Sequence, residues 1–177
     1  MSLDSVQIVR LDADYEFKPF DCGDKDLNEF LLNDSKDYLA KRIAVTYIVE
    51  SLDQTIAYFS LSNDKISLLE SDKTSWRKIK NTFKHRKHRR DYPAVKIGRF
   101  AVDIKYQRSF MGSSLIAYIK QMFLRKNRTG CAFITVDALK GAIPFYIKND
   151  FKFLGDPIRN FDSSTLQLYF DLNSLTI

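Results

Sequence analysis

The chain contains 177 residues, of which 45% are hydrophobic and 14% aromatic, a composition that excludes a disordered chain. Its 28 Lys and Arg residues exceed its 22 Asp and Glu residues, giving a net charge of +6. No apolar run approaches the ~18 residues that cross a membrane, and there is no secretory signal pattern, so we expect one cytoplasmic domain, residues 1–177, without membrane contact. Cys22 and Cys131 lie far apart, and His85 and His88 have no companions at metal-ligand spacing, so we expect no metal site.

Hydrophobic periodicity divides the chain into alternating strand and helix signals. In chain order we expect a strand at Ser5–Leu11, a helix at Lys25–Lys41, strands at Ala44–Glu50 and Thr55–Leu61, a helix at Ser75–Phe83, a buried strand at Val95–Val102, a helix whose apolar stripe runs from Leu115 to Phe123, a buried strand at Ala132–Val136, a helix at Lys140–Asn149, and strands at Phe151–Phe153 and Thr165–Leu172. This order predicts a mixed α/β fold with a central mixed sheet of about six to seven strands, flanked by helices on both faces.

Local signals define the ends of two of these helices. Asp24 or Asp26 can cap the helix expected at Lys25–Lys41, and Pro144 is tolerated only in the first turn of its helix. The side chains of the first helix that we expect to face inward are Leu27, Phe30, Leu31, Tyr38 and Leu39.

Nine basic residues lie between Lys73 and Arg90 without any acidic residue. Without those nine, 19 basic residues face 22 acidic ones, a net charge of −3, so the basicity of the protein is local. Cations interspersed with Trp76 and Phe83 suit a phosphate backbone, which RNA would supply. The predicted nucleic-acid contacts are Arg77, Lys78, Lys80, Lys84, Arg86, Lys87, Arg89 and Arg90. The alternatives are a solvated surface or a site for an acidic partner protein.

A buried strand, a turn at Asp103–Ser109 and a helix follow one another in the middle of the chain, and the first N–H groups of such a helix form an anion site. The sequence there, R-F-A-V-D-x-x-Y-Q-x-x-x-x-G, resembles the pyrophosphate loop Q/R-x-x-G-x-G/A of GNAT N-acetyltransferases, with Gln107 first and Gly112 last. Phe110 stands where the family has a glycine with positive φ. A phenylalanine held there costs roughly 1–2 kcal/mol, so we expect a re-shaped loop or weaker cofactor binding.

The C-terminal part of the chain extends the resemblance. Residues 145–151, F-Y-x-x-x-x-F, are similar to the family's F-Y-x-x-x-G-F, and Ala142 occupies the usual small-residue position. Asp150 replaces the glycine that ends the helix. Because Asp tolerates the left-handed conformation better than most residues, this is a mild departure.

The front of the chain resembles one branch of the family. Residues 20–23 (F-D-C-G), 27–31 (L-N-E-F-L) and 57–62 (A-Y-F-S-L-S) are similar to its F-x-C-G, L-x-x-F-L and G-Y-Y-S-L-S segments. That branch includes bacterial toxins that acetylate the amino group of charged tRNA and are silenced by a ribbon-helix-helix antitoxin. The resemblance therefore implies an antitoxin partner, and it leaves a homodimer open.

The resemblance implies acetyl-CoA as the cofactor and assigns roles to particular residues. Pantetheine would lie along the central strand, the Val102 N–H would face the thioester oxygen, and Arg108 would add a charge contact to phosphate. Tyr146 would be the general acid that protonates the departing thiolate. The expected cofactor-binding residues are Phe100, Ala101, Val102, Gln107, Arg108, Ser109, Phe110, Met111, Gly112, Ser113 and Phe145.

No residue stands out as a general base. Asp103 and Glu50 end strands, but neither has a visible partner that would raise its pKa, and both read as solvated carboxylates. An α-amino group titrates near ~8, against ~10.4 for lysine, so an aminoacyl ester is substantially neutral without a base. The expected function is acetyl transfer to a primary amine, with aminoacyl-tRNA as the acceptor. The alternatives are acetylation of a protein or small amine, or a catalytically inactive GNAT-like interaction module.

Overall fold

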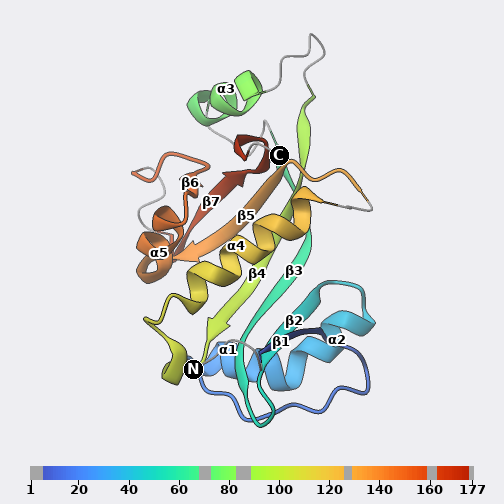
Figure 1. Ribbon diagram of the computed structural model, residues 1–177. Coiled ribbons are helices and arrows are strands. Elements are labelled where there is room, and N and C mark those ends of the chain that lie inside the picture. Colours follow the sequence, from blue (N-terminus) through green and yellow to red (C-terminus); the bar gives the residue numbers. More distant parts are fainter. Residues whose placement is uncertain (1–5, 68–72, 83–88, 126–128, 159–162, 176–177) are drawn as a thin grey trace. The chain divides into compact units, whose positions relative to one another are not determined.

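The computed structural model describes residues 6–67, 73–82, 89–125, 129–158 and 163–175 (Figure 1). The strands are β1 (Gln7–Arg10), β2 (Val45–Glu50), β3 (Thr55–Ser67), β4 (Asp91–Val102), β5 (Phe133–Leu139), β6 (Lys152–Phe153) and β7 (Thr165–Asp171). The α-helices are α1 (Lys25–Glu29), α2 (Ser35–Ala40), α3 (Lys73–Thr82), α4 (Met111–Leu124) and α5 (Ile143–Lys148). A π-helical segment, η2 (Phe30–Asp34), joins α1 to α2, and the 3-10 turns are η3 (Ile104–Tyr106), η4 (Lys140–Ala142) and η5 (Leu172–Ser174).

The strands form a sheet in the order β1-β2-β3-β4-β5-β7-β6. The pairs β1–β2, β2–β3, β5–β7 and β6–β7 are antiparallel, whereas β4 and β5 point the same way (Figure 1), so the expected mixed sheet is confirmed. Two compact units divide the chain: unit 1 comprises Met1–Ser62 and Ile97–Leu115, and unit 2 comprises Asn63–Lys96 and Ile116–Ile177. Strands β3 and β4 and helix α4 each contribute residues to both units. None of the helices in the described ranges is long and apolar enough to cross a membrane.

In unit 1, helices pack on both faces of the sheet. The neighbouring residues Ala57 and Tyr58 of β3 point to opposite faces, as alternation along a strand requires. Tyr58 packs against Phe30 in the helical segment α1-η2-α2, whereas Ala57 packs in a cluster with Leu115 of α4. This confirms the prediction of helices on both faces for this unit.

In unit 2, neighbouring side chains of β7 also point to opposite faces of the sheet. Tyr169 packs in a cluster with Trp76 of α3, whereas the next residue, Phe170, lies under Lys120 of α4 and beside the Phe151 ring. Helix α3 therefore covers one face of the unit 2 sheet, and α4 covers the other.

The helix expected at Lys25–Lys41 is divided by a wide turn. Asp24 is the N-cap, because its Oδ1 accepts a hydrogen bond of 3.1 Å from the Leu27 N–H. At η2 the backbone opens into a π-helical turn, after which the buried Ser35 hydroxyl donates to the Leu31 carbonyl at 2.5 Å. The apolar residues expected to face inward are all in or against one cluster, namely Leu27, Phe30, Leu31, Tyr38 and Leu39.

Strands β3 and β4 are longer than the sequence pattern indicates, because part of the segment read as irregular, residues 65–91, is sheet. Strand β3 continues to Ser67, and β4 begins at Asp91. The Lys65 ammonium lies 3.3 Å from the Asp91 carboxylate, and the Ile66 and Tyr92 side chains pack into the cluster that includes α3. In these added parts of β3 and β4, single buried hydrophobic side chains lie among charged or exposed ones. These parts therefore lack the continuous apolar run that identifies the buried strand at Val95–Val102 in the sequence.

Candidate functional site

The loop between β4 and α4 lies in unit 1 and has left-handed backbone at two residues, neither of them glycine. Arg108 has φ 59° and Phe110 has φ 65°. The expectation of a re-shaped loop at Phe110 is therefore wrong, because Phe110 itself takes the positive φ that the family's glycine supplies. The Phe110 side chain is 76% exposed, so the ring displaces no core residue. Holding this conformation costs roughly 1–2 kcal/mol of backbone strain.

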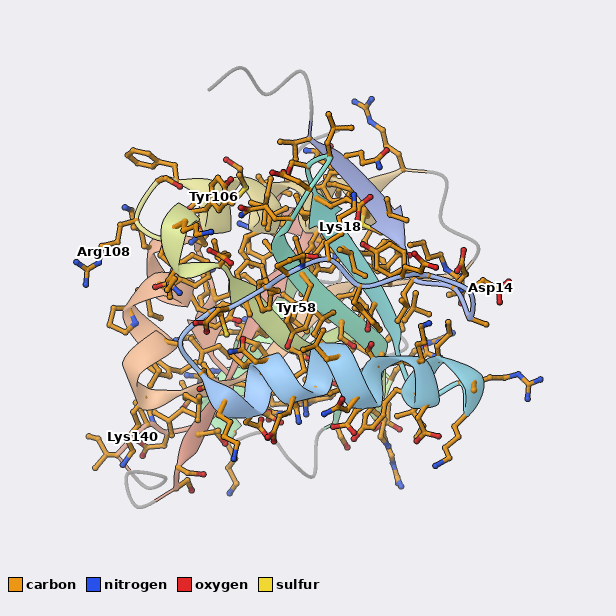
Figure 2. All side chains as sticks on the ribbon, turned by 90° about the horizontal axis from the view of Figure 1, so that it is seen from below. Asp14, Lys18, Tyr58, Tyr106, Arg108 and Lys140 are labelled. Atoms are coloured by element: carbon orange, nitrogen blue, oxygen red, sulfur yellow. The ribbon has the colours of Figure 1, made fainter. Side chains whose placement is uncertain are left out.

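This loop leads directly into the first turn of α4, a helix of 14 residues. The N–H groups of Met111, Gly112 and Ser113 belong to the first turn and have no acceptor within the helix. The positive end of the helix dipole adds to them, and the exposed Arg108 side chain extends away from the ribbon (Figure 2). Ser109 is exposed and its hydroxyl donates to the Tyr106 carbonyl. Backbone amides, a helix N-terminus and a guanidinium are groups that fit the diphosphate of acetyl-CoA.

Gln107 holds the start of this loop to two other segments of unit 1. Its Nε2 donates to the Val102 carbonyl at 2.8 Å and to the Cys22 carbonyl at 2.9 Å. The first bond ties the loop to the end of β4, and the second ties it to the turn before α1. Both donors of the side-chain amide are used, so Gln107 positions the loop rather than offering its amide protons to a ligand.

Asp103 is buried, with 4% of its surface exposed, and it fixes the same turn. Its carboxylate accepts hydrogen bonds from the Lys105 N–H at 2.9 Å and the Asp21 N–H at 3.1 Å. The interpretation of Asp103 as a solvated carboxylate is therefore wrong, because it acts as a cap for backbone amides. The turn that it holds also contains Gly23, whose φ of 81° and close approach to Ile104, 3.4 Å from where a Cβ would lie, favour glycine.

Glu50 is likewise buried and not solvated. It accepts a hydrogen bond of 2.8 Å from Gln7 Nε2 and one from the Tyr15 hydroxyl, and the Lys18 ammonium lies 3.1 Å away. Burial acts to raise the pKa of Glu50, but these hydrogen bonds and the Lys18 charge outweigh it and hold the pKa below its ordinary value. A carboxylate with a lowered pKa and its oxygens occupied is a poor general base. Glu50 instead joins the N-terminal segment to β2.

The three expected cofactor residues of β4 divide between the faces of the unit 1 sheet. Phe100 and Val102 pack with Met111 of α4, whereas Ala101 packs on the face covered by α1-η2-α2. The backbone of residues 99–102 is the part of β4 to which the resemblance assigns the pantetheine arm, an assignment that stays a prediction.

Arg99, two residues before Ala101, has a role that the sequence patterns did not reveal. Its guanidinium lies 5.0 Å from the centre of the Phe30 ring, and its Nη1 donates to the Gly98 carbonyl at 3.0 Å. The Phe30 ring is stacked with Tyr58 at 6.2 Å. Tyr58 in turn donates from its hydroxyl to the Leu27 carbonyl at 2.7 Å (Figure 2). The result is a cation set against an aromatic wall on the α1-η2-α2 face of β4.

Tyr146 and Phe145 belong to unit 2, in α5. The helix begins at Ile143 with Pro144 in its first turn, as expected. Tyr146 is buried, and its ring meets those of Phe145 at 5.1 Å and Phe151 at 5.3 Å. Burial raises the pKa of the Tyr146 phenol, so the group is fully protonated at neutral pH.

The end of α5 is a Schellman motif that holds Tyr146 from behind. The Phe151 N–H donates to the Tyr146 carbonyl at 3.1 Å, and the Asp150 N–H donates to the Ile147 carbonyl at 3.0 Å. Asp150 has φ 66°, the left-handed conformation expected of it as the replacement for glycine. The Tyr146–Phe151 ring contact is the hydrophobic contact that accompanies this motif.

Lys120 of α4 is a buried cation in unit 2 that sequence reasoning missed. Its ammonium donates to the Asn149 carbonyl at 2.8 Å, lies 3.6 Å from the Asp150 carboxylate, and sits 3.7 Å from the centre of the Phe170 ring. Burial lowers the pKa of Lys120, and the Asp150 charge partly opposes this shift. Lys120 lies four residues after the buried Ile116, so a cation on the apolar stripe of α4 was the signal available in the sequence.

Helix α3, in unit 2, presents its cations on one side and packs its apolar residues on the other. Arg77 and Lys78 are exposed and Lys80 is partly buried, while Trp76 and Ile79 are in the core. Trp76 therefore belongs to the core of unit 2 and not to the exposed cationic side of α3. Of the other predicted contacts, Arg89 and Arg90 are exposed before β4, and those outside the described residues are Lys84, Arg86 and Lys87.

Comparison with known proteins places this geometry among acetyltransferases. Residues 81–167 match the family model of the acetyltransferase (GNAT) domain. The Y145F mutant of KacT is 25% identical over 96% of each chain, with a TM-score of 0.76. AtaTR bound with AcCoA is 25% identical over 97% of this chain and 96% of that one, with a TM-score of 0.73. AtaT complexed with acetyl-methionyl-tRNAfMet is 24% identical over 96% of each chain, with a TM-score of 0.75. No curated protein sequence matches the chain.

Proposed function

We propose that the chain, whose residues 81–167 match the acetyltransferase (GNAT) domain, transfers an acetyl group from acetyl-CoA to the amino group of aminoacyl-tRNA. The observation that carries the proposal is the loop before α4, which has glycine-like backbone at Phe110 and leads its amides into a helix N-terminus. The acceptor is proposed from the likeness to AtaT, which is known in complex with acetyl-methionyl-tRNAfMet, and from the exposed cations of α3.

Acetyl-CoA supplies an activated acetyl thioester. The residues of the chain would bind this cofactor and protonate the thiolate that departs from it. In this proposal the amides of Met111, Gly112 and Ser113, with Arg108, hold the diphosphate. The Val102 N–H would be the donor that faces the thioester oxygen and stabilises negative charge on it. No general base is assigned: the ester of an aminoacyl group withdraws charge and lowers the pKa of its α-amino group below the ordinary ~8, so a substantial fraction of the amine is neutral at physiological pH, and the proton that the amine releases after attack would go to water.

Tyr146 is proposed to donate its phenolic proton to the departing thiolate. Burial keeps the phenol protonated, and a thiolate formed in an equally dry environment would also have a raised pKa, which favours the transfer. A group that acts only when the C–S bond breaks contributes to kcat and not to acetyl-CoA binding.

The test is to incubate the purified protein with labelled acetyl-CoA and, in separate reactions, charged tRNA, uncharged tRNA, a protein mixture and small amines. Label should enter charged tRNA alone, and alkaline hydrolysis should release it as an N-acetyl amino acid. Tyr146→Phe should lower kcat at least tenfold while the acetyl-CoA dissociation constant stays nearly the same. Unchanged turnover in that variant would remove Tyr146 from the mechanism, and label in protein or small amines alone would reject the acceptor.

The ionic-strength dependence of the reaction tests the basic surface of α3. If several exposed cations contact the RNA backbone, the rate at subsaturating charged tRNA should fall steeply, by tenfold or more, as salt increases from ~50 to ~200 mM. A small uncharged amine, offered at high concentration, supplies the control, since its rate should change little over the same range.

A partner is part of the same proposal: AtaT is known bound to the C-terminus of the antitoxin AtaR, and an antitoxin of this kind would silence the chain described here.

A further inference from the structure

Arg99 of β4 is a partly buried cation that forms no ion pair within the described residues. Its Nη1 donates to the Gly98 carbonyl, and its Nε is buried with no acceptor in the described part of the chain. A guanidinium carries five N–H donors, and buried polar groups in folded proteins are almost always paired. The buried, unpaired Nε–H therefore points to an acceptor that comes from outside the chain.

The surroundings of Arg99 hold its guanidinium in one orientation. The face of the Phe30 ring lies 5.0 Å from the guanidinium carbon, and Phe30 is fixed in turn against Tyr58 and, edge-on at 5.2 Å, against Tyr38. Contact with a ring uses the planar face of the guanidinium and leaves its edge, where the N–H groups lie, for hydrogen bonds. A planar fork of this kind is the group best matched to a phosphate or carboxylate.

The register of β4 relates Arg99 to the proposed reaction centre. Side chains of a strand alternate, so Arg99 and Ala101 lie on the α1-η2-α2 face, opposite Phe100 and Val102, which pack towards α4. Three residues of strand separate Arg99 from the Val102 N–H that is proposed to contact the thioester oxygen, a span of about 10 Å. A terminal nucleotide esterified with an amino acid is of comparable size.

We propose that Arg99 binds the phosphate of the terminal, aminoacylated nucleotide of the acceptor. This inference rests on the proposed function. The carboxyl group of an aminoacyl ester is esterified and carries no charge, so the phosphate of the terminal nucleotide is the anion nearest the reacting amine. Arg99 would then fix the position of the amine relative to the thioester. It would also make the protein prefer an aminoacyl nucleotide to an amine that has the same amino-acid side chain but no nucleotide.

The test uses two acceptors that differ in one group: aminoacyl-adenosine, and the same compound with a 5′-phosphate. The wild-type protein should use the phosphorylated acceptor with a kcat/KM at least about tenfold higher, mostly through KM. Arg99→Gln should remove this preference by slowing the phosphorylated acceptor and sparing the other, and Arg99→Lys should restore part of it. Arg10→Gln, at an exposed arginine of β1, is the matched control and should keep the wild-type preference.

Two further measurements separate the ways in which this inference can fail. Thermal melting of Arg99→Gln should stay close to that of the wild type, because a merely structural arginine would lower the melting temperature and slow both acceptors equally. Non-hydrolysable amide analogues of the two acceptors report binding without turnover. If the phosphate improves neither binding nor rate in the wild-type protein, Arg99 has no phosphate to bind and the inference is wrong. If charged tRNA and both aminoacyl nucleosides receive no label while other amines do, the proposed function has failed instead.

Discussion

Two turns of the molecule have left-handed backbone at a position where the GNAT pattern has glycine, and they hold it by different means. In unit 1 Phe110 has φ 65°, and in unit 2 Asp150 has φ 66°. Asp is one of the few residues that tolerate this region, whereas phenylalanine is strained in it. The same dihedral angle is therefore reached at a higher backbone cost in the loop before α4 than in the turn after α5.

The difference lies in what surrounds each residue. Asp150 belongs to a Schellman motif with two backbone hydrogen bonds, and Lys120 contacts both its carboxylate and the neighbouring Asn149 carbonyl. Phe110 is 76% exposed; its carbonyl accepts from the Ser114 N–H at 3.0 Å in the first turn of α4, and Gln107 ties the start of the loop to two carbonyls. The loop of unit 1 is thus held from its ends, while the turn of unit 2 is held at its centre.

Removing Lys120 should have the largest effect on stability. Lys120→Met deletes the hydrogen bond from a buried side chain to the turn after α5 and should lower the free energy of unfolding by about 1–3 kcal/mol at pH 7, measured by urea denaturation. Lys152→Met, at an exposed lysine of β6, is the control and should change it little.

The cost of Lys120→Met should also grow with pH. Burial lowers the pKa of Lys120, so between that lowered value and the ordinary 10.5 the unfolded chain holds a proton that the folded chain has released. Wild-type stability rises with pH in this window relative to the variant. If the difference in the free energy of unfolding between the wild type and Lys120→Met became smaller as the pH rises, folding would favour the charged form of Lys120.

The hydrogen bonds of Gln107 come next. Gln107→Ala removes both bonds at the start of the loop, and because the two carbonyls can turn to water, the loss of stability should be about 1 kcal/mol. Acetyl-CoA affinity should fall several-fold, as measured by calorimetry, since the loop amides lose their fixed orientation. Gln121→Ala, on the exposed side of α4, should change neither quantity.

Glycine substitutions at the two left-handed positions should have the smallest effects and should differ from each other. Phe110→Gly relieves roughly 1–2 kcal/mol of backbone strain, but glycine also increases the conformational entropy of the unfolded chain. We therefore expect a net stabilisation of about 0.5–1 kcal/mol. Asp150→Gly relieves less strain and should leave stability within about 0.5 kcal/mol of the wild type. Phe110→Ala separates backbone from side chain, because alanine is also strained at positive φ and should give no gain. Equal gains for Phe110→Gly and Asp150→Gly would contradict the comparison.

The sequence was sufficient for the order of elements, the helix caps and the family resemblance, because each depends on local patterns. Asp24, Pro144 and Asp150 all occupy the positions that their backbone chemistry predicts. The extensions of β3 and β4 were missed, since sheet pairing between distant segments leaves no periodic signal in a run of charged residues.

Side chains whose role depends on tertiary contacts were also missed or misread. Asp103 and Glu50 read as solvated strand ends, but the first accepts a hydrogen bond from the Asp21 N–H, 82 residues away, and the second accepts one from Gln7 in the N-terminal segment. The setting of Arg99 against Phe30 joins β4 to η2, and no spacing rule in a single sequence reports such a pair.

The backbone at Phe110 and Asp150 shows that residues other than glycine can hold the left-handed conformation at two positions where the GNAT pattern has glycine. Signatures written as obligatory glycines would pass over chains such as this one. Relatives with bulky residues at these two positions are better sought by comparing backbone conformation than by matching sequence motifs.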